Sequence, residues 1–428
     1  MQNIIKVNKM SKLIKYNKGI RYVVAQPLIG GMPLGFEEAF GNPPSAIITA
    51  GFANDEHYIH YMNEVRKLNI PVINTDVDYE TFKSTKDEEL YNEHCQDVDV
   101  LMHVAICSGL SAMNASCSGS KARGCPDNDQ NQNMYALTKL GMRMNAKVVA
   151  FENAPGAYTK SGKATMDRLV QIGKEHEYST QLIKTDTLLH SVPQTRQRTF
   201  IMFYNKSSVP VFNYEKLDYQ KLGDYLKNIP ENALYQDIIP GKIDTPLYEF
   251  VLSSTNKSTF LEAVNSLNMK QGTVTAFMAT EHIGFDKAME YFKDDDKTYN
   301  VVKNAKMKKD NGLNYWDSTP YTSFRGDHTN AVVGKHIHLC INPNEERALN
   351  IRELLYLMGM PHDFEMFEPK KNWNHICQNV PVKTAKYIAS EINKFLNNEL
   401  ELSNVNFFKQ DNIRQKYDTP IVANMEEW

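Results

Sequence analysis

Seven short apolar runs in the first 204 residues set the strongest constraint on the fold of this 428-residue chain. Each run is four to nine residues long, and polar stretches with helical spacing lie between them. Short apolar runs that alternate with helices predict an α/β domain with a parallel sheet covered by helices on both faces. The runs are Tyr22–Gln26, Ser45–Ala50, Pro71–Asn74, Val98–Ile106, Lys147–Phe151, Gln181–Lys184 and Arg198–Tyr204.

The rest of the chain divides into a polar middle region and a helical closing region. Residues 205–331 are rich in Lys, Asp and Asn and show weak periodicity, which indicates a second, smaller domain. Asn350 with Glu353 has the form of a capping box, and apolar residues at helical spacing from Ala385 to Leu396 predict a second closing helix. The expected parts are a basic N-terminal segment (1–21), a main domain (22–204 and 332–396), the second domain (205–331) and a C-terminal extension (397–428).

The charge balance and the cysteines exclude several classes of protein. With 48 Lys and Arg against 51 Asp and Glu, the net charge is −3, which argues against a binder that holds nucleic acid through a globally basic surface. No stretch of about 18 apolar residues predicts a membrane span, and the N-terminus lacks the apolar core of a secretory signal. Six cysteines without a CxxC pair indicate neither a disulfide scaffold nor a zinc module. We therefore expect a cytoplasmic protein without a metal ion or a membrane partner.

A glycine-rich turn and two acidic residues follow the first three predicted strands. Gly30, Gly31 and Gly35 come after the first strand, where glycine lets a ligand approach the backbone, although a plain tight turn explains them equally well. Asp55 after the second strand is placed to bind a ribose hydroxyl, and Asp76 after the third to meet an adenine amine. A helix-capping role is the alternative for both acids.

Cys107 and Glu152 leave the fourth and fifth predicted strands at the same edge of the sheet. A cysteine that passes from a buried strand into a Gly/Ser-rich loop can react as a thiolate, and a buried inert cysteine is the alternative. Partial burial of Glu152 would raise its pKa and let it share a proton with a base nitrogen. In extended chain, Gln194, Arg196 and Arg198 point to one face, which suits phosphate and carbonyl oxygens or a solvated strand edge.

Taken in order, these features resemble the cytosine-5 DNA methyltransferase family. The most specific motifs are Glu152-Asn153, Val192–Arg198, and Ile341-Asn342-Pro343 with Arg347, Arg352-Glu353 and Met358–Pro361. The resemblance covers residues 22–204 and 332–396 and implies a Rossmann-like, S-adenosylmethionine-dependent methyltransferase domain with a smaller target-recognition domain at 205–331. It implies double-stranded DNA as the partner and leaves a cognate restriction system open. We expect a monomer in the cytoplasm of a bacterial or phage-infected cell.

The resemblance also implies a role for each residue of the reaction centre. Cys107 matches the nucleophile that adds to C6 of cytosine, and Glu152 matches the residue that holds N3 and the exocyclic amine. Arg198 matches the arginine that contacts the cytosine O2, while Arg196 and Gln194 match its partners in positioning the base and the catalytic loop. The implied reaction transfers a methyl group from S-adenosylmethionine to C5 of a flipped-out cytosine, through a covalent Cys107 adduct.

Further matched positions concern the methyl donor and the DNA. The expected S-adenosylmethionine site comprises Gly30, Gly31, Gly35, Asp55, Asp76, Asn379 and Val380. The expected DNA contacts are Gln194, then Ser108 and Ser111 of the loop that closes on DNA, and Arg325 of the target-recognition domain. In that domain, the basic stretch Val301–Lys309 and nearby aromatic residues favour a surface for a nucleic-acid groove, with an ordinary solvated loop as the alternative.

Three motifs depart from the family pattern. In place of the family's Pro-Cys-Gln motif, this chain has Ile106-Cys107-Ser108. Its Gln26–Gly31 segment lacks the phenylalanine and the first glycine of the family's Phe-x-Gly-x-Gly-Gly motif. In the last motif, usually Gln-x-Gly-Asn-x-Val-Pro, Asn379 is shifted by one position. Because the cysteine, the glutamate and both arginines are kept, we expect an active enzyme. The alternatives are an RNA cytosine-5 methyltransferase and a catalytically weak DNA-binding protein that keeps the fold.

Overall fold

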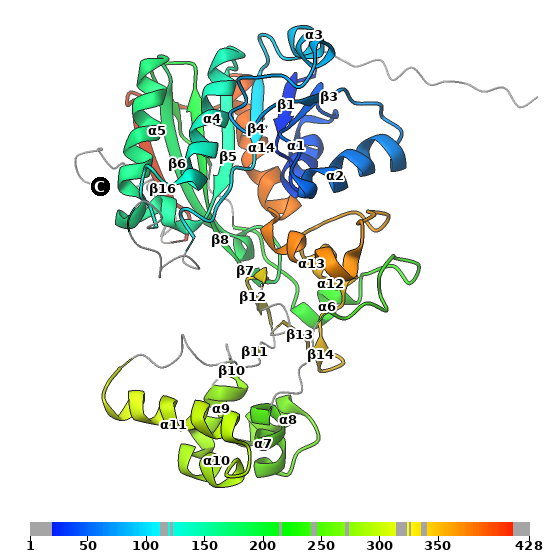
Figure 1. The fold of residues 1–428 in the computed structure, drawn as a ribbon, viewed down its shortest axis with the longest axis vertical. Coiled ribbons are helices and arrows are strands. Elements are labelled where there is room, and N and C mark those ends of the chain that lie inside the picture. The colour runs from blue at the N-terminus through cyan, green and yellow to red at the C-terminus, as the bar shows by residue number, and fades with distance from the viewer. Residues whose placement is uncertain are drawn as a thin grey trace, which may run out of the picture.

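The chain forms a large α/β body and a smaller helical body, which Figure 1 shows above and below one another. The structure is a computed structural model that describes residues 19–111, 119, 123–213, 216–240, 246–269, 274–313, 323–324, 327–334 and 340–413. The predicted DNA contact Arg325 and most of the basic N-terminal segment therefore lie outside the described residues. None of the helices in these ranges is long and apolar enough to cross a lipid bilayer.

An eight-stranded sheet in the order β16-β6-β8-β5-β4-β1-β2-β3 forms the centre of the large body. Each of the seven apolar runs overlaps one of its strands, and most of the strand residues are buried on both faces, as the continuous apolar runs predict. The strands are β1 (Tyr22–Ala25), β2 (Ala46–Thr49), β3 (Val72–Asn74), β4 (Val100–His103), β5 (Val148–Asn153), β6 (Ser179–Asp186), β8 (Gln197–Tyr204) and β16 (Phe407–Asp411).

The sheet is mixed, whereas the sequence analysis predicted a parallel one. β8 runs antiparallel to both of its neighbours, β5 and β6. Only residues 187–196 connect β6 to β8, and a parallel crossover needs a dozen or more residues, usually with a helix. β16 pairs in parallel with β6, so this part of the predicted C-terminal extension is the edge strand of the main sheet.

Helices cover both faces of the sheet, as predicted. Alternate strand residues divide the interior into two cores: Tyr22 and Val24 of β1 belong to one, and Val23 and Ala25 to the other. The helices are α1 (Gly31–Phe40), α2 (Ala53–His60) continued by the π-helical turn Tyr61–Val65, α3 (Thr85–His94), α4 (Asp129–Arg143), α5 (Lys163–Glu175), α6 (Leu222–Leu226), α12 (Ile351–Leu357), α13 (Pro369–Gln378) and α14 (Val382–Leu396). The capping box predicted from Asn350 and Glu353 is present at the start of α12.

Short strand pairs connect the parts of the chain. β7 (Gln194–Thr195) pairs in parallel with β12 (Thr329–Asn330), which brings the end of the middle region against the segment before β8. The other pairs are β9 (Val209–Pro210) with β15 (Leu402–Ser403), β10 (Val274–Thr275) with β11 (Ser323–Phe324), and β13 (Ile341–Asn342) with β14 (Arg347–Ala348).

The smaller body has its own core. Buried aromatic residues such as Phe250, Phe260 and Phe277 pack together there. Its helices are α7 (Pro246–Thr255), α8 (Phe260–Ser266), α9 (Ala276–Ile283), α10 (Phe285–Tyr291) and α11 (Asp296–Asp310). The earlier part of the predicted second domain, including Val209 and α6, packs into the core of the large body instead.

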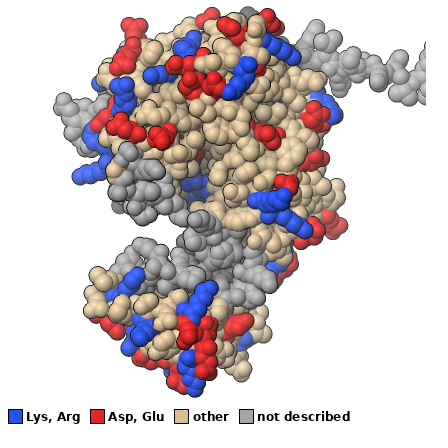
Figure 2. Space-filling view, viewed as in Figure 1, with Lys and Arg blue, Asp and Glu red and all other residues tan. Residues whose placement is uncertain are grey.

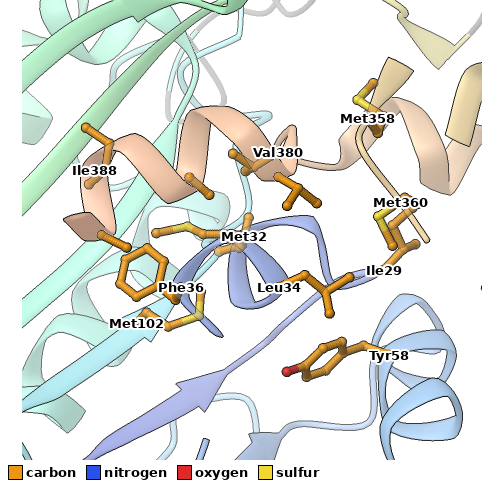
Figure 3. Packing of buried hydrophobic residues seen from close by; sticks show 14 of the residues in the cluster. Ile29, Met32, Leu34, Phe36, Tyr58, Met102, Met358, Met360, Val380 and Ile388 are labelled. Carbon is orange, nitrogen blue, oxygen red and sulfur yellow. The ribbon is translucent and has the colours of Figure 1, made fainter. Parts of the chain in front are cut away.

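The closest helix packing in the large body joins α1 to α14. Figure 3 shows Met32 and Phe36 of α1 beneath α14, with Ile388 of α14 and Met102 of β4 beside them. A Cβ atom placed on Gly35 would lie 2.5 Å from the carbonyl oxygen of Val382. Glycine at this position therefore lets the two helix backbones approach one another.

Replacing Gly35 with alanine should destabilise the protein, because the added methyl group would overlap Val382 and Ala385. We expect the free energy of unfolding, measured with urea, to fall by about 1–3 kcal/mol. Gly334→Ala is the matched control, since no described atom lies within 4 Å of the Cβ it would add. Equal stability of the two variants would contradict the close packing of α1 on α14.

Candidate active site

A cavity of about 340 Å³ lies where the central strands end. Gln26 and Leu28 after β1, Phe52–Asn54 after β2, Val104–Ser108 after β4, Glu152 of β5 and Gln378 at the end of α13 line it. The carboxyl ends of β1, β2, β4 and β5 thus meet at one cavity, which is where open α/β sheets bind ligands.

The structure brings Cys107 and Glu152 together in this cavity, as the strand positions predict. Cys107 is half-buried, and the carboxyl of Glu152 is buried at the end of β5. The neighbouring strand β8 places Arg198 beside it, with Nε 2.5 Å from Oε1 of Glu152. A thiol and a carboxyl therefore line the same cavity, and a guanidinium is paired with the carboxyl.

The environment of this group affects the pKa values of the thiol and the carboxyl. Burial raises the pKa of Glu152, and the charges of Arg198 and Arg196 oppose the rise. Burial raises the pKa of Cys107, the negative charge of Glu152 adds to the rise, and the two arginines oppose it. Because protonation of Glu152 removes one of these causes, a ligand that shares a proton with Glu152 favours the thiolate of Cys107.

Arg196 and Gln194 are buried side chains that hold the backbone in place. The guanidinium of Arg196 donates from Nη1 to the Val332 carbonyl at 2.9 Å, and from Nη2 to those of Cys377 and Asn379 at 2.7 and 2.8 Å. Oε1 of Gln194 accepts a hydrogen bond from the backbone N–H of Val332 at 3.1 Å. Both side chains are at most 1% exposed, and the charge of Arg196 acts on Cys107 and Glu152. The roles predicted for Arg196 and Gln194 in positioning the base and the DNA stay predictions.

The predicted glycines and the final motif contact each other. The backbone N–H of Gly31 donates to Oδ1 of Asn379 at 2.8 Å, and a Cβ on Gly31 would lie 2.0 Å from the Val380 carbonyl oxygen. Gly30 caps α1 with a left-handed φ of 103°. Gly31 with Asn379 and Val380, and Gly35 with Val382, form packing contacts between the start of α1 and the closing segment, whereas Gly30 faces Tyr58. None of Gly30, Gly31, Gly35, Asn379 and Val380 lines the cavity.

The two predicted acids also lie outside the cavity lining. Asp55 is fully buried. Its carboxylate accepts hydrogen bonds from the Leu28 N–H at 2.9 Å and from the Thr49 hydroxyl at 2.7 Å. Asp55 thereby stabilises the turn after β1. Burial raises the pKa of Asp55 to about 7. Asp76 is at the surface, where it forms an ion pair with Lys83. The ribose contact predicted for Asp55 and the adenine contact predicted for Asp76 stay predictions.

A sequence model described as the C-5 cytosine-specific DNA methylase family matches residues 28–394. This chain belongs to that family. A structure of a prophage-encoded E. coli protein, described as a DNA modification methyltransferase, is 15% identical with a TM-score of 0.54, over 88% of this chain and 99% of the other. Entamoeba histolytica methyltransferase EhMeth is 12% identical with a TM-score of 0.52, over 89% and 99%. No curated protein sequence matches the chain.

Several residues that line the cavity of this methylase were not predicted. Gln26 and Leu28 have left-handed φ angles of 49° and 54°, which non-glycine residues rarely adopt. Nδ2 of Asn54 donates to Oε1 of Gln378 at 2.6 Å, so this hydrogen bond joins α2 to α13 at the cavity. The sequence could have pointed to Gln26 and Leu28, because they stand where the family motif has a phenylalanine and a glycine.

The start of the predicted DNA-closing loop is partly described. Ser108 lines the cavity, and its hydroxyl donates to Oε1 of Gln130 at 2.9 Å. Ser111 is half-buried at the last described position before residue 119. No group of three His, Cys, Asp or Glu side chains within the described ranges could hold a metal ion.

The stability of the methylase should fall with rising pH because of Asp55. Its pKa of about 7 in the folded protein exceeds the ordinary value of 3.8, so between these values the folded form holds a proton that the unfolded form has lost. Relative to Asp55→Asn, the free energy of unfolding of the wild type should fall between pH 5 and pH 8 by on the order of 2 kcal/mol. Urea unfolding at both pH values measures this difference. A pH-independent difference between the wild type and Asp55→Asn would refute the shift.

Proposed function

We propose that this chain is an S-adenosylmethionine-dependent DNA (cytosine-5)-methyltransferase. The observation that carries the proposal is the presence of Cys107 and Glu152 in one cavity on the carboxyl edge of the sheet, with Arg198 paired to Glu152. A thiol, a buried carboxyl and a guanidinium are the three groups that activation of a cytosine ring at C6, N3 and O2 requires. The family match supports cytosine C5 as the target.

The residues of the cavity fit a methyl donor that contains a nucleoside. Phe52 offers an aromatic ring, and Gln26, Asn54 and Gln378 offer amide groups among otherwise mainly apolar side chains. When bound, S-adenosylmethionine supplies an electrophilic methyl group for C5. No Lys or Arg lines the described cavity, which suits a donor with a positively charged sulfonium centre.

In the proposed mechanism, the Cys107 thiolate adds to C6 of cytosine and makes C5 nucleophilic. Glu152 shares a proton with N3 and so stabilises the negative charge that develops on the ring during addition. Its raised pKa favours the protonated form that this role needs. Arg198 lies beside Glu152, where its guanidinium can donate to the cytosine O2. After methylation, loss of the C5 proton and elimination of the Cys107 thiolate restore the aromatic ring.

The burial of this group requires the cytosine to leave the base stack. Glu152 is 3% exposed, and a base inside a duplex cannot reach a carboxyl at this depth. Extrusion of one nucleotide costs a few kcal/mol, which contacts in the pocket must offset. The proposed substrate is therefore a flipped-out cytosine.

We assign recognition of the target sequence to the middle region, including the helical body. Figure 2 shows cations and anions intermixed on the visible face of that body. In α11, Lys306 pairs with Asp286 at 3.1 Å and Lys309 with Glu281 at 2.7 Å. Two lysines of the predicted basic stretch are thus partly neutralised, which weakens the case for this stretch as a DNA-binding surface. RNA therefore remains the second candidate substrate.

Expression in a host without cytosine methylation, followed by sequencing that detects 5-methylcytosine, tests the function directly. We expect methylated cytosines in one sequence context of the host DNA. Methylation of host RNA without methylation of DNA would replace the proposal with its RNA alternative. The absence of 5-methylcytosine from both nucleic acids would contradict the enzymatic proposal.

Cys107→Ser should lower the methylation rate by at least about 1,000-fold, because a serine hydroxyl is a far weaker nucleophile than a thiolate at neutral pH. Binding of the same DNA should change little. Cys125→Ser is the matched control, since Cys125 is also a partly exposed free cysteine and does not line the cavity. Turnover of Cys107→Ser at the rate of the control would rule out Cys107 as the nucleophile.

Glu152→Gln should make Cys107 react at lower pH, since the negative charge of Glu152 raises the pKa of the thiol. The midpoint of Cys107 alkylation by iodoacetamide, followed by mass spectrometry, should shift downward in the variant. The methylation rate should nevertheless fall, because glutamine cannot share a proton with N3. An unchanged alkylation midpoint would show that the two groups are not coupled.

A further inference from the structure

The side-chain amide of Gln26 is fixed in one orientation by a chain of hydrogen bonds. The backbone N–H of Ile106 donates to Asn133 at 3.1 Å, so the atom that accepts must be Oδ1 of Asn133. Nδ2 of Asn133 then donates to Gln26 at 3.0 Å, so the atom that accepts must be Oε1 of Gln26. The hydroxyl of Tyr79 donates to the same oxygen at 2.8 Å.

This orientation directs the donor end of the amide toward the cavity. Oε1 of Gln26 is held by two donors, and Nε2 makes no hydrogen bond within the described part of the chain. The residue is 1% exposed, yet it lines the cavity. An N–H group that lines a cavity and has no protein partner is available to an acceptor on a bound ligand.

The backbone supports the same conclusion. Gln26 has a φ of 49°, a conformation that is unfavourable for residues other than glycine. Such conformations persist where surrounding contacts enforce them, and they are concentrated at ligand sites. Here the contacts from Tyr79 and Asn133 hold the side chain that the strained backbone presents.

The neighbouring side chains favour a neutral heteroaromatic ligand at this point. Leu28, Phe52 and Ala53 give this part of the cavity an apolar and aromatic lining. An anionic group here would have no cation along the described lining and would share the cavity with Glu152. A ring nitrogen of a purine is an acceptor that combines with stacking against an aromatic side chain.

We propose that Gln26 is a specificity-determining residue that donates from Nε2 to a ring nitrogen of the adenine of the methyl donor. The inference rests on the proposed function, because it takes the donor to be S-adenosylmethionine. Gln26 selects a ligand with an acceptor at that position, and Asn133 is the positioning residue that keeps the donor end of the amide directed at it.

Binding of two adenine ligands by calorimetry tests the proposal. S-adenosylhomocysteine and 5′-methylthioadenosine share the nucleoside, and only the first carries the amino acid. Gln26→Leu should weaken both by the same factor, about 5- to 10-fold, as expected for one neutral hydrogen bond. Weakening of S-adenosylhomocysteine alone would place Gln26 at the amino-acid half and overturn the proposal, as would unchanged affinity for both.

A second variant tests the orientation of the amide without changing the lining. Asn133→Asp presents an acceptor to Gln26 in place of a donor, which favours the rotated amide with Oε1 toward the cavity. The variant should lose affinity for both ligands to a similar extent as Gln26→Leu, and the double variant should lose little more. Additive losses in the double variant would contradict the orienting role. Thermal unfolding of each variant with and without ligand checks that the folded protein is measured.

Binding of the two ligands by the wild type separates a failure of the proposed function from a failure of this inference. If the wild type binds neither ligand, the choice of methyl donor fails and the inference fails with it. If the wild type binds both ligands and Gln26→Leu binds them equally well, the inference alone fails. Gln132→Leu, at an exposed glutamine one residue before Asn133 and outside the cavity lining, should leave both affinities unchanged.

Discussion

The contact between Arg196 and the closing segment holds together the parts of the chain on which the site depends. One buried guanidinium binds the carbonyls of Val332, Cys377 and Asn379, and the side chain of Asn379 accepts the N–H of Gly31. Burial lowers the pKa of Arg196 to about 9, so the arginine remains charged at neutral pH. A buried charge whose two Nη atoms are bound to three carbonyls is costly to disturb, so this contact joins the segment before β8 firmly to the closing segment.

The sequence was sufficient for features that depend on local pattern. Seven strands of the main sheet were predictable because each overlaps a short apolar run. The start of α12 was predictable because Asn350 and Glu353 cap it three residues apart. Cys107 and Glu152 were predictable as neighbours because parallel strands end at a common edge. Strand β16 was missed because Lys409, Gln410 and Asp411 interrupt its apolar pattern, although all three are buried.

Features that depend on distant partners were not predictable in the same way. Gly31 and Asn379 are 348 positions apart, and Arg196 and Asn379 are 183 apart, so no local pattern shows that they meet. For Asp55, the sequence suggested a ligand contact or a helix cap. In the structure its carboxyl is buried and accepts the N–H of Leu28, a contact that neither expectation included. The contact of Gly31 with Asn379 and Val380 is likewise visible only in the folded chain.

The position of β16 affects how this protein can be synthesised. Its partner β6 is complete at residue 186, but the pairing strand begins only at Phe407. Until the ribosome has produced that strand, the edge of β6 has no neighbour, and an uncovered edge is a template for pairing with other chains. The helical body, with a core drawn almost entirely from residues 247–305, can fold earlier. A chain that terminates before residue 407 would thus contain every residue that lines the cavity and still be prone to aggregation.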